Sequence, residues 1–365
     1  MKKRLVLLMC AIFAVSAAIN AQNPEQQLAD AIVKYQMKSG GWPKNQDWLK
    51  GPDMEVMKQC QKTGIGSTID NGATVNELRA LAKGCDKVYD VIAQNMPGVD
   101  NKLLMARVEV YRESFYRGIE YLLKMQYENG GWPQFYPAKK NNDYSSQITF
   151  NDNAIVNVMK LLKEVGTGAP AFKNMEVSKS MKKDCMKAFD KGIQCILDCQ
   201  IRVDSNGKVI EYGTEEWKQG TRTVWCQQHD KKTLAPVKGR AYELPSFTAQ
   251  GETVDILLLL MDITLPTPEV KEAINAAVDW LEEHAIKDTE IEHFTNADGK
   301  KDIKLVNKPG APLLWARFYD LENAEPMYCG RDGIAKKNLS EIEYERRNGY
   351  QWIGDGPSKV IKMYR

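Results

Sequence analysis

The chain has 365 residues, with 50 Lys and Arg against 48 Asp and Glu, so its formal net charge is only +2. This near balance gives no general reason to expect a nucleic acid as partner. The sequence also lacks the GxSxG, P-loop, GxGxxG and HExxH patterns, and it holds just 3 histidines. The common nucleophile, phosphate-binding and dinucleotide chemistries are therefore disfavoured.

The first 21 residues have the composition of an export signal. Basic residues at positions 2–4 precede an apolar run, and small residues lead to Ala21. We expect cleavage after Ala21, which leaves residues 22–365 as a single mature domain, periplasmic or secreted. The apolar run at 255–262 is too short to span a membrane. Without coiled-coil heptads, we expect a monomer.

Helical patterns dominate the rest of the chain. Apolar residues recur at three- and four-residue spacing in four segments, at 25–37, 112–127, 181–200 and 268–286. Thr267 followed by Pro268 predicts the start of the last helix. Strand-like alternation is scarce, and the segment 208–212 is the best candidate for a short hairpin.

A Gly-Gly-Trp-Pro corner occurs at 40–43 and again at 130–133, each time after a helical segment that ends near a glutamine. Glycine permits a tight backbone, proline fixes the exit of the chain, and tryptophan covers apolar surface. We interpret the corner as a structural helix end with a packed aromatic ring. A sugar-stacking role for either tryptophan is the alternative.

A second repeat accompanies the first, because residues 69–81 align without gaps on residues 150–162. Each unit then consists of a helix, a GGWP loop, a polar segment and a helix opened by Asp and Asn. A third, degenerate unit runs from 189–200 to 245–262. Three such units in a ring predict an all-α fold, an (α/α)3 toroid with long loops and few short strands.

Side-chain oxygens collect at the starts of the repeated helices. The residues concerned are Asp70, Asn71, Asn151, Asp152 and Asn153. Asp and Asn are favoured as helix N-caps, so capping explains them without a ligand. Hard oxygen ligands of this kind also suit Ca²⁺. The sequence leaves both interpretations open.

Basic residues lie among aromatics, glycines and prolines in two later segments. Lys238 and Arg240 flank a glycine, Arg317 stands in an aromatic run, and Arg331 occupies a turn-like piece. Arginine grips a planar carboxylate with two parallel hydrogen bonds. These positions are therefore candidates for binding an acidic ligand, with structural ion pairing as the alternative.

Four segments together resemble the family 10 pectate lyases: "GGWPQFYP", "FNDNA", "TLAPVKGRAYELPS" and "PLLWARFYDLE". The resemblance spans about residues 27–355. It implies an (α/α)3 toroid that cleaves polygalacturonate by β-elimination with Ca²⁺, leaving products that are unsaturated between C4 and C5.

The resemblance also implies roles for the acidic helix starts. Asp152 in "FNDNA" is similar to the substrate-site, calcium-linked aspartate of the family. Asp70 with Asn71 looks like the second acidic element of that site. On this basis Asp152 and Asp70 are the expected metal ligands, and Asp70 and Asn71 are expected to bind substrate.

The basic residues receive roles in the same way. Arg240 in "GRAYELPS" resembles the arginine assigned as Brønsted base. Arg317 and Arg331 look like the pair that binds uronate carboxylates, and Lys238 is a further candidate. A free arginine has a pKa above about 12, so we expect burial beside Lys238, Arg317, Arg331 and Ca²⁺ to lower it and activity to be alkaline.

Two other functions remain open at this stage. An (α/α)-barrel glycoside hydrolase would use two carboxylates and water, and Asp70 and Asp152 could serve as acid and base. A non-catalytic periplasmic carbohydrate-binding protein would use the aromatic-rich loops for binding alone.

Overall fold

The computed structural model describes residues 23–94, 99–139 and 143–365. The predicted export signal at 1–21 lies outside these residues. The chain forms two compact units. Unit 1 runs to Gln126 and adds Gln134–Lys139 and Asn157–Asp190, and unit 2 contains Tyr127–Pro133, Lys140–Val156 and Lys191–Arg365.

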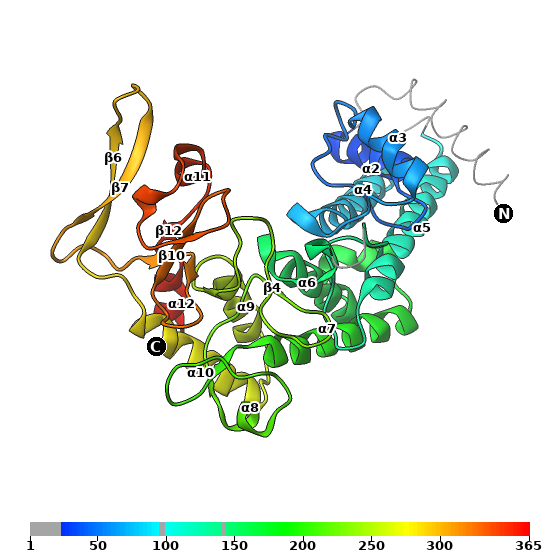
Figure 1. Cartoon of the computed structure of the whole chain (residues 1–365). Coiled ribbons are helices and arrows are strands. Elements are labelled where there is room, and N and C mark those ends of the chain that lie inside the picture. The colour runs from blue at the N-terminus through cyan, green and yellow to red at the C-terminus, as the bar shows by residue number, and fades with distance from the viewer. Residues whose placement is uncertain (1–22, 95–98, 140–142) are drawn as a thin grey trace. The chain divides into compact units, whose positions relative to one another are not determined.

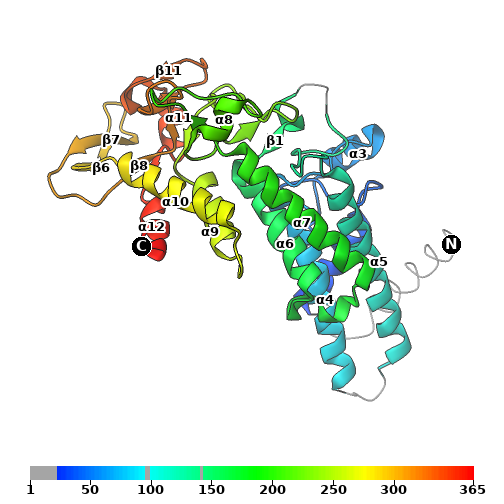
Figure 2. The same ribbon diagram turned by 90° about the horizontal axis from the view of Figure 1, so that it is seen from below.

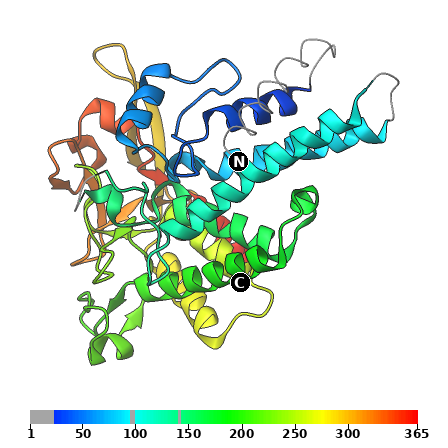
Figure 3. The same cartoon turned by 90° about the vertical axis from the view of Figure 1, so that its right-hand side faces the viewer.

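Unit 1 is helical. Its elements are α2 (Pro24–Tyr35), α3 (Met54–Thr63), the 3₁₀ turn η1 (Asp70–Gly72), α4 (Val75–Ala93), α5 (Asn101–Met125), most of α6 (Ala154–Thr167), the 3₁₀ segment η4 (Pro170–Met175) and the first part of α7 (Lys179–Cys199). The dark-blue α2 packs against α4 and α5 (Figure 3). In Figure 2, α4 and α5 run side by side. The shared core includes Ile32, Leu78 and Phe115, each at most 1% exposed.

Unit 2 mixes helices with short strands (Figure 1). Its helices are the end of α7, α8 (Glu215–Gln219), α9 (Glu252–Met261), α10 (Pro268–Glu283), α11 (Tyr344–Asn348) and α12 (Gly356–Tyr364), with 3₁₀ turns η2 (Tyr144–Ser146), η3 (Asn151–Asn153) and η5 (Leu339–Glu341). Its short strands are β1 (Ile148–Thr149), β2 (Arg202–Val203), β3 (Thr221–Arg222), β4 (Gln228–His229), β5 (Phe247–Thr248), β8 (Trp315–Ala316), β9 (Phe318–Tyr319), β10 (Pro326–Cys329), β11 (Ala335–Lys336) and β12 (Ile353–Gly354). One sheet has four strands in the order β11-β10-β9-β5, and all strand pairs in the described residues are antiparallel.

The longest strands form a hairpin of β6 (Thr289–Thr295) and β7 (Lys301–Asn307), drawn in gold in Figure 1. Across its strands, Lys304 Nζ lies 2.8 Å from the Glu292 carboxylate. The Arg347 guanidinium binds both oxygens of the buried Asp302, at 2.7 and 2.6 Å, and so anchors β7. The sequence analysis did not predict this hairpin, because its half-exposed strands lack the apolar face that a pattern search detects.

The predicted fold class, mostly helical with few short strands, is confirmed. All four predicted helices exist, as α2, α5, α7 and α10, although α5 begins at Asn101, eleven residues before the predicted start. Thr267 caps α10 as predicted: its hydroxyl accepts the Val270 N–H at 3.3 Å. The hairpin expected around 208–212 appears as a bridge between Val209 and Val203.

Both GGWP corners are structural. A Cβ added to Gly40 (φ +107°) would lie 2.4 Å from the Arg117 carbonyl oxygen, and one added to Gly130 (φ +88°) would lie 2.0 Å from that of Lys191. Only glycine lets the loop backbone lie this close to a neighbouring helix. Trp42 and Trp132 are both 0% exposed. The structural interpretation is confirmed, and the sugar-stacking alternative is wrong for these two rings.

A shared contact marks the repeats. In each, a glutamine that follows a helix donates its side-chain amide to a carbonyl of another helix: Gln36 to Ser114 (2.8 Å), Gln126 to Ala188 (2.9 Å) and Gln200 to Ala273 (2.9 Å). The Trp225 indole N–H donates to the Ile196 carbonyl at 2.7 Å, as that of Trp42 does to Ile32. These contacts support the third, degenerate unit. The same indole contact recurs from Trp315 to Leu281 at 2.7 Å, a third occurrence that the sequence analysis missed.

The described cysteines are packing residues of the core. The seven cysteines of the described residues are free and buried. Cys195 and Cys199 face each other within α7 with their sulfurs 4.0 Å apart, as expected for packing residues. In the same part of the chain, no helix combines the length and apolarity needed to cross a bilayer.

Candidate active site

The segment before α6 places Asp152 on an unusual backbone. Asp152 (φ +51°) and Asn153 (φ +57°) are left-handed within η3, as is Asn71 (φ +53°) within η1. Asn and Asp tolerate this conformation better than other non-glycine residues. No side-chain cap hydrogen bond forms at the start of η1, η3 or α4. Asp70 and Asn71 therefore do not cap η1 or α4, and no side chain caps η3.

Asp152 is exposed in unit 2 and is held by its neighbour. The Asn151 side-chain amide donates to Asp152 Oδ2 at 2.9 Å. Asn151 Oδ1 in turn accepts from Gln227 Nε2 at 3.1 Å, and both Asn151 and Gln227 are buried. The carboxylate of Asp152 thus has a fixed position and remains accessible to a ligand.

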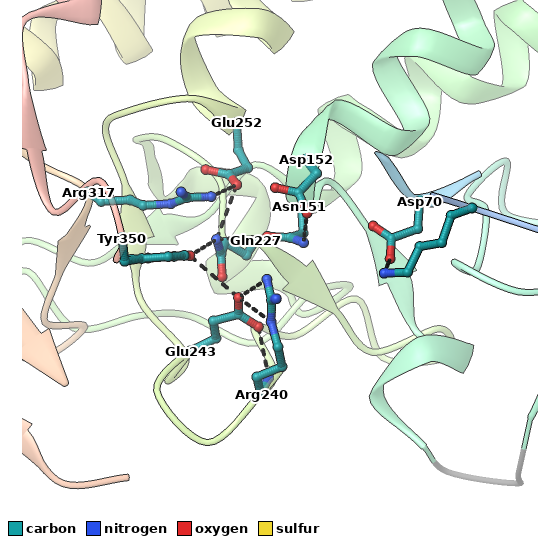
Figure 4. Close-up of polar contacts among 10 residues, drawn as sticks. Asp70, Asn151, Asp152, Gln227, Arg240, Glu243, Glu252, Arg317 and Tyr350 are labelled. Atoms are coloured by element: carbon teal, nitrogen blue, oxygen red, sulfur yellow. Dashed lines mark hydrogen bonds and ion pairs between the residues drawn. The ribbon is translucent and has the colours of Figure 1, made fainter. Parts of the chain in front are cut away.

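Arg317 lies beside this carboxylate, between β8 and β9 (Figure 4). Its Nη2 binds Glu252 Oε1 at 2.6 Å, and its guanidinium carbon stands 4.5 Å from the centre of the Tyr350 ring. Burial lowers the pKa of Arg317, but the charge of Glu252, with smaller effects of Tyr350 and Asp152, outweighs it and leaves the pKa raised. Arg317 is a permanent cation at the exposed Asp152.

Arg240 is bound on one edge by a buried carboxylate. Its Nε and Nη2 lie 2.8 and 2.6 Å from Glu243 Oε1, and its own backbone N–H donates to Glu243 Oε2 at 2.8 Å. Burial lowers the pKa of Arg240, but the hydrogen bond and charge of Glu243 outweigh it, so the pKa is raised. The sequence expectation of a pKa lowered by neighbouring cations is wrong here, because the nearest charge is an anion.

One run of polar contacts joins these groups in unit 2, as the dashed lines of Figure 4 show. Gln227 Nε2 donates to Glu252 Oε1 at 3.1 Å and lies 3.3 Å from the Tyr350 hydroxyl. The Tyr350 hydroxyl lies 3.4 Å from Glu243 Oε1. The structure therefore brings Asp152, Arg317 and Arg240 together around two buried carboxylates.

Arg331 lies further along the same unit and is exposed. Its Nε and Nη2 bind the Glu345 carboxylate at 2.9 Å each, and Arg346 Nη2 shares that carboxylate at 3.0 Å. Arg346 stands over the Tyr242 ring at 4.5 Å. The Lys238 amine lies against the same loop, 3.3 Å from where a Cβ on Gly333 would be. Both predicted cations are thus near Arg240, but neither contacts it.

Asp70 and Asn71 belong to unit 1 and have partners there. Lys44 forms an ion pair with Asp70 Oδ2, while the other oxygen, Oδ1, is buried without a hydrogen-bond partner. The Asn71 amide donates to Asn45 Oδ1 at 3.0 Å. Lys44 and Asn45 directly follow the first GGWP corner, so that loop positions the partners of both predicted residues.

The sequence analysis missed Glu243, Glu252, Gln227 and Tyr350. Glu243 was detectable, since it follows Arg240 by three residues in the same motif. Glu252 and Tyr350 were not, because they come from α9 and from the segment after α11 and meet Arg317 only in the folded chain.

In the described ranges, no three His, Cys, Asp or Glu side chains converge into a group that could hold a metal ion. The two predicted ligands differ in their surroundings: Asp152 is exposed, and in unit 1 Asp70 Oδ1 is buried without a hydrogen-bond partner. Carboxylate oxygens are the ligands that Ca²⁺ prefers.

The family model described as Pectic acid lyase matches residues 36–361. Among curated proteins, none matches. The chain is similar to the solved Family 10 polysaccharide lyase from Cellvibrio cellulosa, with 29% identity, 93% of this chain and 90% of that one covered, and a TM-score of 0.70. A mutant of that enzyme in complex with trigalacturonic acid matches with 28% identity, 93% and 91% coverage, and a TM-score of 0.70. The chain therefore belongs to the pectic acid lyase family and is a polysaccharide lyase.

Proposed function

We propose that this polysaccharide lyase is a pectate lyase that cleaves α-1,4-linked polygalacturonate by Ca²⁺-dependent β-elimination, with Arg240 as the Brønsted base. The observation that carries the proposal is the group of Asp152, Arg317 and Arg240 in unit 2. Two fixed guanidinium groups beside one exposed carboxylate suit an acidic sugar better than a neutral one. Binding of trigalacturonic acid by the similar Cellvibrio enzyme points to the same ligand class.

Elimination removes the proton on C5, next to the uronate carboxylate. Arg317 is assigned to that carboxylate, with Arg331 and Lys238 assigned to carboxylates of neighbouring sugars, and Asp70 and Asn71 complete the proposed substrate site. Arg317 stays charged beside Glu252, so it stabilises the negative charge that develops on the sugar carboxylate as the proton leaves. Arg240 is assigned the role of the base that removes the C5 proton.

Asp152 and Asp70 are the proposed ligands of Ca²⁺. The fit rests on their chemistry, since both are carboxylates and Asp70 Oδ1 is buried without a partner. When bound, Ca²⁺ neutralises the sugar carboxylate and so acidifies the C5 proton. Because the described side chains include no group of three acids, we expect the sugar carboxylates to supply the remaining oxygens and Ca²⁺ to bind weakly without substrate.

Two further expectations belong to this proposal. The basic and apolar start of the sequence implies export to the periplasm or the medium. The near-neutral charge and the lack of coiled-coil heptads imply a monomer.

The role of Arg240 is tested by Arg240→Lys, which keeps a cation for binding and removes the guanidine. General base catalysis contributes about 10²–10⁴-fold, so we expect kcat to fall by about 10³-fold while the affinity for trigalacturonic acid changes less than about 10-fold. Arg365→Lys, at the exposed C-terminus, is the control. Near-normal turnover by Arg240→Lys would refute the assignment.

A further inference from the structure

Glu243 holds two of the three nitrogens of the Arg240 guanidinium. Nε donates a hydrogen bond to Glu243 Oε1 at 2.8 Å, and Nη2 forms an ion pair with the same oxygen at 2.6 Å. Within the described part of the chain, Nη1 makes no hydrogen bond or ion pair. The Arg240 side chain is 38% exposed and that of Glu243 only 2%. One nitrogen of the proposed base therefore remains open to a ligand.

The position of the Glu243 carboxylate is fixed by the loop that carries it. The backbone N–H of Arg240 donates to Glu243 Oε2 at 2.8 Å, and the Glu243 N–H returns to the Arg240 carbonyl at 3.0 Å. A Cβ on Gly239 would lie 2.6 Å from Glu243 Oε2, so the glycine makes room for the carboxylate. The Tyr350 hydroxyl, 3.4 Å from Oε1, approaches it from another segment.

The other charged and titratable groups near this pair come from two segments, the loop that carries Arg240 and the C-terminal segment. Tyr242 stands under the Arg240 guanidinium at 5.3 Å, and Lys238 precedes it in the same loop. Tyr350 faces the pair from the C-terminal segment. Arg346, from the same segment, lies over the Tyr242 ring. Glu243 is the only carboxylate that binds Arg240 in the described residues.

We propose that Glu243 is a positioning residue that selects the tautomer of the neutral Arg240 side chain, so that its lone pair resides on the open nitrogen Nη1. The inference rests on the proposed function of Arg240. In a neutral guanidine, two nitrogens keep all their hydrogens and the third carries the lone pair. Nε cannot be that third nitrogen without losing its only hydrogen, which it donates to Glu243. Nη2 is the stronger partner of the carboxylate while it keeps both hydrogens, so the nitrogen that gives up a proton is Nη1. A buried aspartate sets the histidine tautomer of serine proteases in the same way.

The step balances without a further reagent. Nη1 of the neutral guanidine takes the C5 proton and becomes part of a guanidinium, which Glu243 stabilises. The electron pair of the C5–H bond forms the C4–C5 double bond, and the C4–O bond breaks with its electrons on the departing oxygen. That oxygen takes a proton from water, and Nη1 returns its proton to solvent before the next turnover.

Glu243 also disfavours formation of the neutral Arg240 side chain, and this effect can be measured as a change in the pH profile. The carboxylate that selects Nη1 also raises the pKa of Arg240, so the active neutral form accumulates only at alkaline pH. Removing the charge of Glu243 should therefore have two opposed effects. More of the neutral guanidine forms at a given pH, but its lone pair is no longer confined to Nη1.

The experiment compares pH profiles of kcat for the wild type and Glu243→Gln with polygalacturonate. We expect the alkaline limb of the Glu243→Gln variant to level off at lower pH than that of the wild type, with a maximal kcat reduced about 100-fold or more. Glu243→Asp keeps the charge, so its limb should stay at the wild-type position. Glu164→Gln is the matched control, because Glu164 binds Arg79 bidentately at 2.6 and 2.8 Å in unit 1.

The inference would be overturned if the alkaline limb of the kcat profile in a folded Glu243→Gln variant lay at the same pH as in the wild type. It would also be overturned if the maximal kcat of this variant equalled that of the wild type. Thermal unfolding and trigalacturonic acid binding show whether each variant is folded. If Glu243→Gln does not fold, the pH profile of Glu243→Asp provides the test. A shift of the alkaline limb in Glu243→Asp would then overturn the inference. An active Arg240→Lys variant refutes the proposed base itself. An inactive Arg240→Lys with an unmoved Glu243→Gln limb refutes only the role of Glu243.

Discussion

At the scale of single residues, the site depends on carboxylates buried behind its arginines. Glu252 is 1% and Arg317 13% exposed, and they meet at 2.6 Å. Arg317 is therefore held in a desolvated position, where the charge of Asp152 still acts on it. Such an arginine needs its counter-charge, because an uncompensated charge inside a protein is strongly destabilising.

We expect Glu252→Ala to reduce the free energy of unfolding by about 3–5 kcal/mol, because it leaves Arg317 buried without its partner. Urea denaturation followed by circular dichroism measures the loss. Glu55→Ala is the control, since Glu55 pairs with the exposed Lys58 and surface pairs contribute little. Equal losses in both variants would contradict the burial argument.

His229 makes stability depend on pH. It is 0% exposed, Nδ1 donates to the Leu234 carbonyl at 2.7 Å, and Nε2 accepts from the Cys226 N–H at 3.1 Å. Burial lowers the pKa of His229 from 6.5 to about 4. The unfolded chain therefore binds this proton more readily than the folded chain, and the stabilisation present above pH 6.5 is lost as pH falls towards 4.

We expect a loss of about 3 kcal/mol across that window, at about 1.4 kcal/mol per pH unit. Denaturant unfolding at pH 7 and pH 4.5 measures it. In His229→Gln this pH dependence should be smaller, whereas the same change at the exposed His293 should leave it unaltered. An identical pH dependence in wild type and His229→Gln would rule out the histidine as its source.

At the scale of elements, the GGWP corner is a close approach between a loop and a helix. Gly130 has φ +88°, and a Cβ there would lie 2.0 Å from the Lys191 carbonyl oxygen in α7. Gly207 has a similar φ of +81° but open space around the added atom. Substitutions at the two glycines can therefore be compared to distinguish the effect of backbone strain from that of steric overlap.

We predict that Gly130→Ala lowers the free energy of unfolding by about 2–5 kcal/mol, from strain of about 1–2 and overpacking of about 1–3. Gly207→Ala should lose only the strain contribution of about 1–2 kcal/mol. Chemical denaturation of both variants decides the matter. Equal losses would show that the corner does not need its close contact.

The elements also show what a sequence can predict. The four periodic helices and the cap at Thr267 follow from local patterns, so they were predicted. The β6–β7 hairpin was not, because its strands are half exposed and rich in charge. Among the site residues, Arg240 and Arg317 stood in conspicuous motifs, whereas Glu252 comes from a different element, and its contact with Arg317 exists only in the folded chain.

At the scale of the whole molecule, repeated helical units support a polar site assembled from loops. The Gln contacts join the end of one helix to another helix, and the Trp contacts join a loop to a helix, at several points along the chain. Asp152 comes from a repeated helix start, whereas Arg240, Glu243 and Arg317 come from single loops. Glu243 is an example of the latter, since it accepts both the side chain and the backbone of the arginine three residues before it.

The central claim is that an acidic sugar chain is cleaved by proton removal from carbon. The most direct test is to follow polygalacturonate with the purified protein in the ultraviolet, with and without a calcium chelator. We predict a rise in absorbance from the conjugated double bond of the new chain ends, abolished by the chelator and restored by added Ca²⁺. New reducing ends without ultraviolet absorbance, undiminished by the chelator, would contradict the account and indicate hydrolysis.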